Sequence, residues 1–233
     1  MTKLGLLNSV WNKVLTTVLP AKCVGCGVSG TYLCDDCLAS ALWLEEPQCE
    51  MCAEPGVASP CSRCRLRPLA VDGTVAVFAM DGVIRKAVHH LKYRNLRALA
   101  PILGRPMADA LTRRGVVVNA LVPIPMHPRQ LRRRGYNQAA LLAKEVGARL
   151  DVPVEEAYLR RHRWSGPQVA TADYDSRWAN VAYAFLCEAD VQGKSLMLVD
   201  DVMTTGSTMH SAARTLKEAG AAQVWALALA REV

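Results

Sequence analysis

Apolar residues fall along this chain in short continuous runs, separated by segments in which they recur at helical spacing. The runs predict strands at residues 74–80, 116–124, 154–159, 181–186, 195–199 and 224–229. The helical spacing predicts helices at residues 83–91, 96–111, 136–150 and 209–219. Pro101 and Pro106 are expected to break or kink the second helix. Strands that alternate with helices are typical of an α/β fold with a parallel sheet, whose ligands bind at the carboxyl ends of the strands.

The first twenty residues carry their own apolar stripe, which predicts an amphipathic helix ending at Pro20. Packing of this stripe on the body of the protein is favoured over a membrane-surface role, because the polar face is not basic. Polar residues such as Asn8, Ser9, Asn12 and Lys13 interrupt any signal-peptide core, and no apolar run is long enough to span a membrane. The chain is therefore expected to be cytoplasmic, with attachment at the inner face of the membrane as the second option.

Eight of the nine cysteines form four C-x-x-C pairs, which are Cys23/Cys26, Cys34/Cys37, Cys49/Cys52 and Cys61/Cys64. Two such pairs complete a tetrahedral zinc site, whereas a disulfide framework is typical of secreted chains. Redox chemistry is disfavoured because C-x-x-C redox sites are normally single. Sequential pairing is the more natural arrangement, and interleaved pairing stays open. The pattern predicts structural Zn²⁺ in a double zinc finger at residues 21–68, between the N-terminal helix (1–20) and an α/β domain (69–233).

Composition adds one constraint. The 233 residues carry a formal net charge of +7 and are 51% hydrophobic. This composition indicates a folded chain and excludes a low-complexity one. The positive charge is compatible with a polyanionic partner, such as a phosphorylated substrate, nucleic acid or anionic lipid, but does not choose between them.

The most informative chemistry follows the strand predicted at 195–199. Two carboxylates, Asp200 and Asp201, are followed by a loop of hydroxyls and glycine and then by a helix start; the loop residues are Thr204, Thr205, Gly206, Ser207 and Thr208. Backbone N–H groups, hydroxyls and a helix N-terminus together suit a phosphate monoester. The two carboxylates suit sugar hydroxyls or Mg²⁺. An ordinary strand-to-helix turn would explain only one carboxylate and one capping residue.

Two further segments are rich in arginine. The first follows the strand at 116–124 and contains His127, Arg129, Arg132, Arg133 and Arg134. A solvated helix face is the usual role of such a run, but arginines at the start of the helix at 136–150 would oppose its dipole and so indicate a bound anion. The second segment, at residues 160–180, contains Arg160, Arg161 and Arg163 beside Trp164. It reads equally as a lid that stacks on a base and as an exposed loop.

The acidic pair and the T-T-G-x-T loop resemble the 5-phosphoribosyl-1-pyrophosphate (PRPP) signature of type I phosphoribosyltransferases. Together with several other motifs, they resemble the ComF family of competence-associated proteins. The other motifs are the C-x-x-C pairs, L-K-Y at 91–93, P-I-P-M-H-P at 123–128, R-G-Y-N-Q at 134–138, and Gln168, Arg177 and Asn180. The resemblance implies a type I phosphoribosyltransferase-like parallel sheet flanked by helices, preceded by a small cysteine-rich zinc-finger domain. It also implies that Asp200 and Asp201 lie beneath the ribose hydroxyls and that residues 204–208 surround the 5′-phosphate.

Two classes of function follow from the resemblance. In the first, the protein acts in DNA uptake, binds PRPP or a nucleotide phosphate, and contacts single-stranded DNA through the arginines at 129, 132–134, 160, 161 and 163, with competence-machinery proteins as candidate partners. In the second, it is an active phosphoribosyltransferase that binds Mg²⁺-PRPP, holds the pyrophosphate near His127 and Arg129, and transfers ribose 5-phosphate to a nitrogenous acceptor. A third reading keeps the fold as a relic, with zinc fingers that recruit a partner protein.

Overall fold

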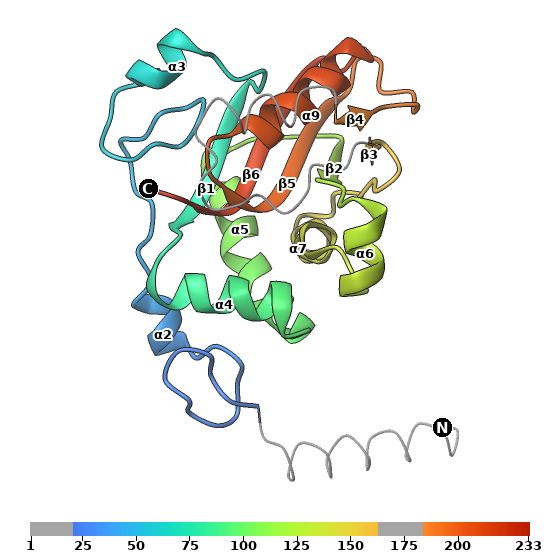
Figure 1. Ribbon diagram of the computed structural model, residues 1–233. Helices are drawn as coiled ribbons and strands as arrows, with labels where there is room; N and C mark the ends of the chain where they lie inside the picture. Colours follow the sequence, from blue (N-terminus) through green and yellow to red (C-terminus); the bar gives the residue numbers. More distant parts are fainter. Residues whose placement is uncertain (1–20, 163–183) are drawn as a thin grey trace.

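A computed structural model describes residues 21–162 and 184–233 (Figure 1). The strands are β1 (Gly73–Ala79), β2 (Ala120–Pro123), β3 (Arg160–Arg161), β4 (Phe185–Leu186), β5 (Ser195–Met203) and β6 (Gln223–Arg231). The helices are α2 (Asp35–Ala39), α3 (Ser62–Leu66), α4 (Gly82–Tyr93), α5 (Ala100–Arg114), α6 (Pro128–Arg134), α7 (Gln138–Leu150) and α9 (Ser207–Glu218), with a 3-10 turn η1 (Arg97–Leu99).

The core of the molecule is a four-stranded sheet in the order β1-β6-β5-β2, in which every pair is parallel. Representative register pairs are Val75 with Leu227, Val199 with Leu227, and Leu121 with Met197. The strands are almost continuously apolar because both faces of the sheet are covered. Since all strands run in one direction, their carboxyl ends meet at one edge of the sheet, where the loops after β2 and β5 also lie.

Helices cover the two faces of the sheet unequally. Helices α4, α5 and α7 pack on one face with side chains such as Val77 and Met197, whereas α9 packs on the other with Leu198. The two groups of cysteines are divided in the same way: Cys23 belongs to the core beneath α4, and Cys49 belongs to the core beneath α9. Figure 1 shows this division, with the segment around α2 and the segment around α3 at opposite ends of the molecule.

The chain between the two cysteine groups runs along the free side of β1. Trp43 forms an antiparallel bridge with Phe78, and the two rings lie 4.4 Å apart between centroids. The Leu44 N–H donates to the Val77 carbonyl at 2.9 Å, and the Ala79 N–H donates to the Leu42 carbonyl at 2.8 Å. This contact covers part of an edge that would otherwise expose strand N–H and C=O groups.

Several predicted strands have different limits in the structure. The run at 116–124 forms a strand only at Ala120–Pro123, because its partner β5 begins at Ser195. The run at 154–159 contributes one bridge, from Val154 to Leu121, before the chain turns at Glu156. Conversely, β5 continues past Val199 to Met203 because β6 extends beside it to Arg231.

Helix limits also differ from those predicted. Pro101 does not break a helix at 96–111, because it lies in the first turn of α5, where its missing N–H has no intrahelical partner. Pro106 lies within α5, which continues to Arg114. Helix α7 begins at Gln138 rather than at Tyr136, because the Asn137 side chain accepts the Ala139 N–H at 3.1 Å and caps the helix. The predicted N-terminal helix and the strand residues 181–183 lie outside the described part of the chain.

Candidate functional site

The predicted acidic pair lies on β5 itself, two residues before the strand ends at Met203. Asp201 is 2% exposed, and its Oδ2 atom lies 2.8 Å from the Lys92 ammonium at the end of α4. Burial alone would raise the pKa of Asp201, but the Lys92 ammonium lowers it. Asp200 is half-buried, and burial and the Asp201 carboxylate raise its pKa well above the usual range. The two carboxylates therefore differ: Asp201 is neutralised within the protein, and Asp200 is the one available to a ligand.

The loop after β5 makes a tight turn that leads into the N-terminus of α9. Gly206 has φ +81°, and a Cβ atom there would lie 2.8 Å from the Met203 side chain and 2.9 Å from that of Leu69. The Thr205 hydroxyl donates to the Ser207 hydroxyl at 3.0 Å and accepts the Ser207 N–H at 3.3 Å. Helix α9 begins at Ser207, so the first N–H groups of a twelve-residue helix lie beside these hydroxyls.

Buried polar contacts hold this loop from behind. Arg231, at the end of β6, is 1% exposed and donates to the Thr204 carbonyl at 2.9 Å. The same guanidinium forms an ion pair with Glu54, which lies between the cysteines of the second group. In α9, which follows the loop, His210 accepts the Ala70 N–H at 3.1 Å.

The segment after β2 places His127 and Arg129 at the same edge of the sheet. His127 caps α6 through a 3.2 Å hydrogen bond from the Arg129 N–H. Desolvation and the guanidiniums of Arg129, Arg161 and Arg132 lower the pKa of His127. Arg161 in β3 is also electrostatically coupled to Asp200, because burial lowers the pKa of Arg161 and the Asp200 carboxylate raises it. Arg161 therefore interacts electrostatically with both His127 and Asp200.

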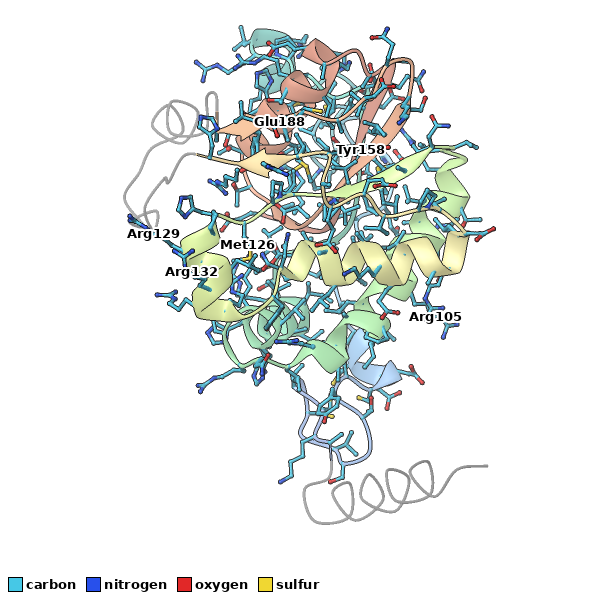
Figure 2. The ribbon with its side chains drawn as sticks, turned by 90° about the vertical axis from the view of Figure 1, so that its right-hand side faces the viewer. Arg105, Met126, Arg129, Arg132, Tyr158 and Glu188 are labelled. Carbon is cyan, nitrogen blue, oxygen red and sulfur yellow. The ribbon has the colours of Figure 1, made fainter. Side chains whose placement is uncertain are left out.

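The arginine run requires a correction. Arg132, Arg133 and Arg134 do not oppose the dipole of the following helix, because they form the last turn of α6, where a helix dipole favours cations. Gly135, at φ +80°, ends that helix. Figure 2 shows Arg129 and Arg132 on the outer side of α6. Helix polarity alone therefore accounts for Arg132–Arg134. Their position in the sequence does not by itself indicate a bound anion.

The remaining arginines of the predicted set lie in different surroundings. Arg160 is exposed and lies 3.5 Å from Glu188, two residues after β4, while Arg161 interacts electrostatically with Asp200. Arg163, together with Trp164 and the motif residues between 168 and 180, lies outside the described residues. The arginine set is therefore not one continuous patch: Arg161 belongs with Asp200, and Arg132–Arg134 belong to α6.

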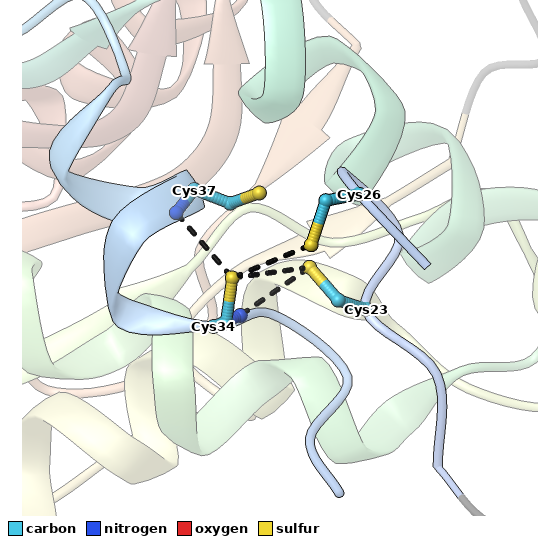
Figure 3. Close-up of side chains that lie close together, drawn as sticks. All are labelled: Cys23, Cys26, Cys34 and Cys37. Carbon is cyan, nitrogen blue, oxygen red and sulfur yellow. Dashed lines mark hydrogen bonds between the residues drawn. The ribbon is translucent and has the colours of Figure 1, made fainter. Parts of the chain in front are cut away.

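The cysteines form the two sequential tetrads that the spacing favours. Within each tetrad the four sulfur atoms lie within 4.8 Å of one another, and the members are Cys23, Cys26, Cys34 and Cys37 in the first and Cys49, Cys52, Cys61 and Cys64 in the second. The Sγ atom of Cys34 lies 3.7 Å from those of Cys23 and Cys26 (Figure 3). A tetrahedral Zn–S bond of about 2.3 Å gives a sulfur–sulfur distance of about 3.8 Å. Each tetrad can hold a structural Zn²⁺.

The second tetrad is the more enclosed of the two, since all four of its cysteines are buried. The Cys61 N–H donates to the Cys49 sulfur at 3.3 Å. Although burial raises the pKa of Cys49, hydrogen bonds from the backbone lower it to about 7. Backbone donors around a thiolate are the usual outer contacts of a zinc–cysteine site, and they fit the metal proposed from the spacing.

One family model and three relatives match this chain. A model of the phosphoribosyl transferase domain matches residues 133–232. The chain is 31% identical over 207 residues to the DNA utilization protein YhgH of Escherichia coli K12, covering 84% of this chain and 89% of that protein. It is 28% identical over 182 residues to Competence protein F of Haemophilus influenzae, with 74% and 80% covered. It is 24% identical over 201 residues to Competence protein ComFC of Streptococcus pneumoniae, with 85% and 87% covered.

This chain belongs to the ComF family. The phosphoribosyl transferase model begins at residue 133, so it includes β5, the hydroxyl-rich loop and α9. Lys92 and both tetrads precede the matched residues. Nevertheless, Lys92 pairs with Asp201 and Glu54 pairs with Arg231, and both Asp201 and Arg231 lie within the matched residues. In this ComF protein, the residues before the matched domain therefore supply part of its site.

Lys92, Glu54 and Arg231 are residues of the site that sequence reasoning did not assign. One signal for Lys92 was its position four residues after the buried Val88 on α4, which directs it toward the core side of the helix. For Arg231 the signal was a cation at the end of an otherwise apolar strand. No helix in residues 21–162 or 184–233 has the length and apolar character needed to span a membrane.

Proposed function

We propose that this ComF protein acts in DNA uptake or utilisation and binds PRPP, or another phosphorylated ribose, at the end of β5, and single-stranded DNA through nearby cations. The observation that carries the proposal is the Thr204–Gly206 turn, which leads from the acidic pair directly into the N-terminus of α9. The names of the relatives support the biological role, since they describe DNA utilisation and competence.

The proposed ligand orientation follows from the charges of the site. The 5′-phosphate would bind the N–H groups and hydroxyls of Thr205, Gly206, Ser207 and Thr208. Asp200 would accept hydrogen bonds from the ribose hydroxyls or bind Mg²⁺, because Asp201 is already paired with Lys92. The pyrophosphate would lie toward Arg161 and His127, where the guanidiniums disfavour a second positive charge on the imidazole.

The test is a calorimetric titration of PRPP with Mg²⁺ into the zinc-loaded protein, with Asp200→Asn as the variant. Binding that is lost in the variant supports the proposal. Glu188→Gln is the control, because this exposed carboxylate lies two residues after β4 and forms a surface ion pair with Arg160. No binding by the wild-type protein, or equal binding by Asp200→Asn, would contradict the proposed PRPP site.

Single-stranded DNA is tested separately. If cations of this edge contact the phosphates, affinity should fall steeply as salt rises, because binding releases counterions. Absent binding, or binding that does not depend on salt, would contradict the DNA part of the proposal. Release of pyrophosphate on addition of a base or amine would instead support the second function, an active phosphoribosyltransferase.

A further inference from the structure

We propose that a cavity between the ends of α4 and α6 binds one nucleotide of a DNA single strand, with the base on the Tyr93 ring and the phosphate on Arg133 and Arg134. This inference rests on the proposed binding of single-stranded DNA and gives it a location. It adds a base-binding position to the phosphate loop and acidic pair of the site described above.

The cavity has the size and charge for one nucleotide. Its volume is about 320 Å³, and its lining residues are Lys92, Tyr93, Asn95, Arg133, Arg134 and Tyr136. Three of these side chains are cationic and, among the described residues that line the cavity, none is acidic. Small-molecule sites span roughly 300–1,000 Å³, so the cavity admits a single nucleotide. An anionic, planar ligand complements this lining better than a neutral one.

Tyr93 provides the surface for a base. It is 59% exposed, which is unusual for a large aromatic side chain on a helix that otherwise buries its apolar residues. The Arg134 guanidinium lies 5.3 Å from its ring centroid, and the His89 ring lies 5.0 Å away at a tilt of 49°. An exposed ring between cationic and aromatic neighbours is the usual platform on which single-stranded nucleic acids stack their bases.

Tyr136 has a different role in the same cavity. Its side chain is 6% exposed, and its hydroxyl donates to the Leu91 carbonyl near the end of α4. This contact ties the start of α7 to α4 and fixes the cavity wall. Tyr93 is therefore the ring with most of its surface open to a base, and Tyr136 keeps the two helices at their spacing.

The charges leave the phosphate to Arg133 and Arg134. The Lys92 ammonium lies 2.8 Å from the Asp201 carboxylate, so its positive charge is largely balanced within the protein. Arg134 donates to the Gln138 amide oxygen at 2.5 Å, which orients its guanidinium beside Tyr93. Arg133 is exposed on the last turn of α6. A nucleotide held here would lie next to the acidic pair, with Lys92 between the two positions.

An unpaired base is required for this arrangement, because a base within a duplex stacks on its neighbours and cannot lie on Tyr93. The inference therefore predicts a preference for single strands at this cavity. It also predicts tolerance of base identity, because stacking on an aromatic ring uses the face that every base shares.

The experiment is fluorescence anisotropy with a labelled oligothymidine on the zinc-loaded full chain. Tyr93→Ala should weaken binding by about five-fold or more, and Tyr93→Phe should bind like the wild type, since stacking needs the ring and not the hydroxyl. Arg133→Ala should also weaken binding. The matched control is Arg105→Ala, an exposed arginine on α5 that Figure 2 places on the far side of the molecule from Arg129 and Arg132.

A crosslink supplies the position independently of affinity. An oligonucleotide that carries 5-iododeoxyuridine should crosslink under ultraviolet light to Tyr93, and mass spectrometry of the peptides identifies the site. Wild-type binding with unchanged affinity in Tyr93→Ala and a crosslink elsewhere would overturn this inference and leave the proposed function intact. No binding of single strands by the wild-type protein would overturn both this inference and the DNA part of the proposed function.

Discussion

Arg231, at the end of β6, donates a 2.9 Å hydrogen bond to the backbone carbonyl of Thr204 in the loop after β5. Its guanidinium is buried and also pairs with Glu54 from the second cysteine group. A buried cation is costly unless its charge and its donors are satisfied. The proposed phosphate loop and the second tetrad are therefore held by the same side chain.

Replacing Glu54 should destabilise the protein strongly. In Glu54→Gln the Arg231 charge stays buried without its counter-charge, and the expected loss is about 3–5 kcal/mol in the free energy of unfolding. Urea unfolding of the zinc-loaded protein measures it. Glu156→Gln is the control, because Glu156 pairs with Lys144 at the surface and such pairs contribute at most about 1 kcal/mol. Equal losses in the two variants would show that the Arg231–Glu54 pair has no special weight.

The buried pair of Lys92 and Asp201 leads to a prediction about compensation. Lys92→Met leaves the Asp201 carboxylate buried and unpaired, so it should cost about 3–5 kcal/mol of stability and raise the pKa of Asp201. Asp201→Asn in the same chain removes the uncompensated charge. The double variant should therefore be more stable than Lys92→Met alone, as measured by a urea double-mutant cycle. Additive losses would mean that the two side chains do not depend on each other.

His210 should make stability depend on pH. Burial and Arg214 lower the pKa of His210, and its Nδ1 atom accepts the Ala70 N–H, so the folded state favours the neutral ring. The unfolded chain, with a histidine pKa of about 6.5, then binds more protons, and stability is lost as pH falls below that value toward the folded pKa.

His210→Gln keeps an acceptor for the Ala70 N–H but removes the titration. Between about pH 7.5 and pH 5.5, the wild type should lose more unfolding free energy than this variant. Titration of the cysteine tetrads affects both proteins alike, so the difference between the two pH profiles isolates His210. Parallel profiles would contradict the assignment.

The parts of the site that were predicted from sequence are local in the chain. The two tetrads were predicted because each closes over a short turn, and the turn around Gly206 because strand, hydroxyls and helix follow one another. The pair of Arg231 and Glu54 joins residues 177 positions apart, and only the fold brings them together. The same holds for Lys92 and Asp201. The run at 116–124 was predicted too long because its partner β5 begins only at Ser195, which the apolar pattern of the run does not reveal.

The two tetrads should affect different parts of the molecule when they lose metal. Cys26→Ser disrupts the first tetrad, whose neighbour Gly25 lies against Val83 near the start of α4. Cys64→Ser disrupts the second tetrad, which reaches the proposed phosphate loop through Glu54 and Arg231. Hydrogen exchange should therefore accelerate at the start of α4 in Cys26→Ser and at Thr204–Ser207 in Cys64→Ser. Each variant serves as the control for the other, and metal analysis should give one zinc ion fewer than the wild type in both.

Because a structural zinc site of this kind dominates the stability of a small cysteine-rich segment, the effect should be largest within each tetrad and extend only along its own contacts. The same exchange pattern in both variants would contradict the separate coupling of the second tetrad to the loop.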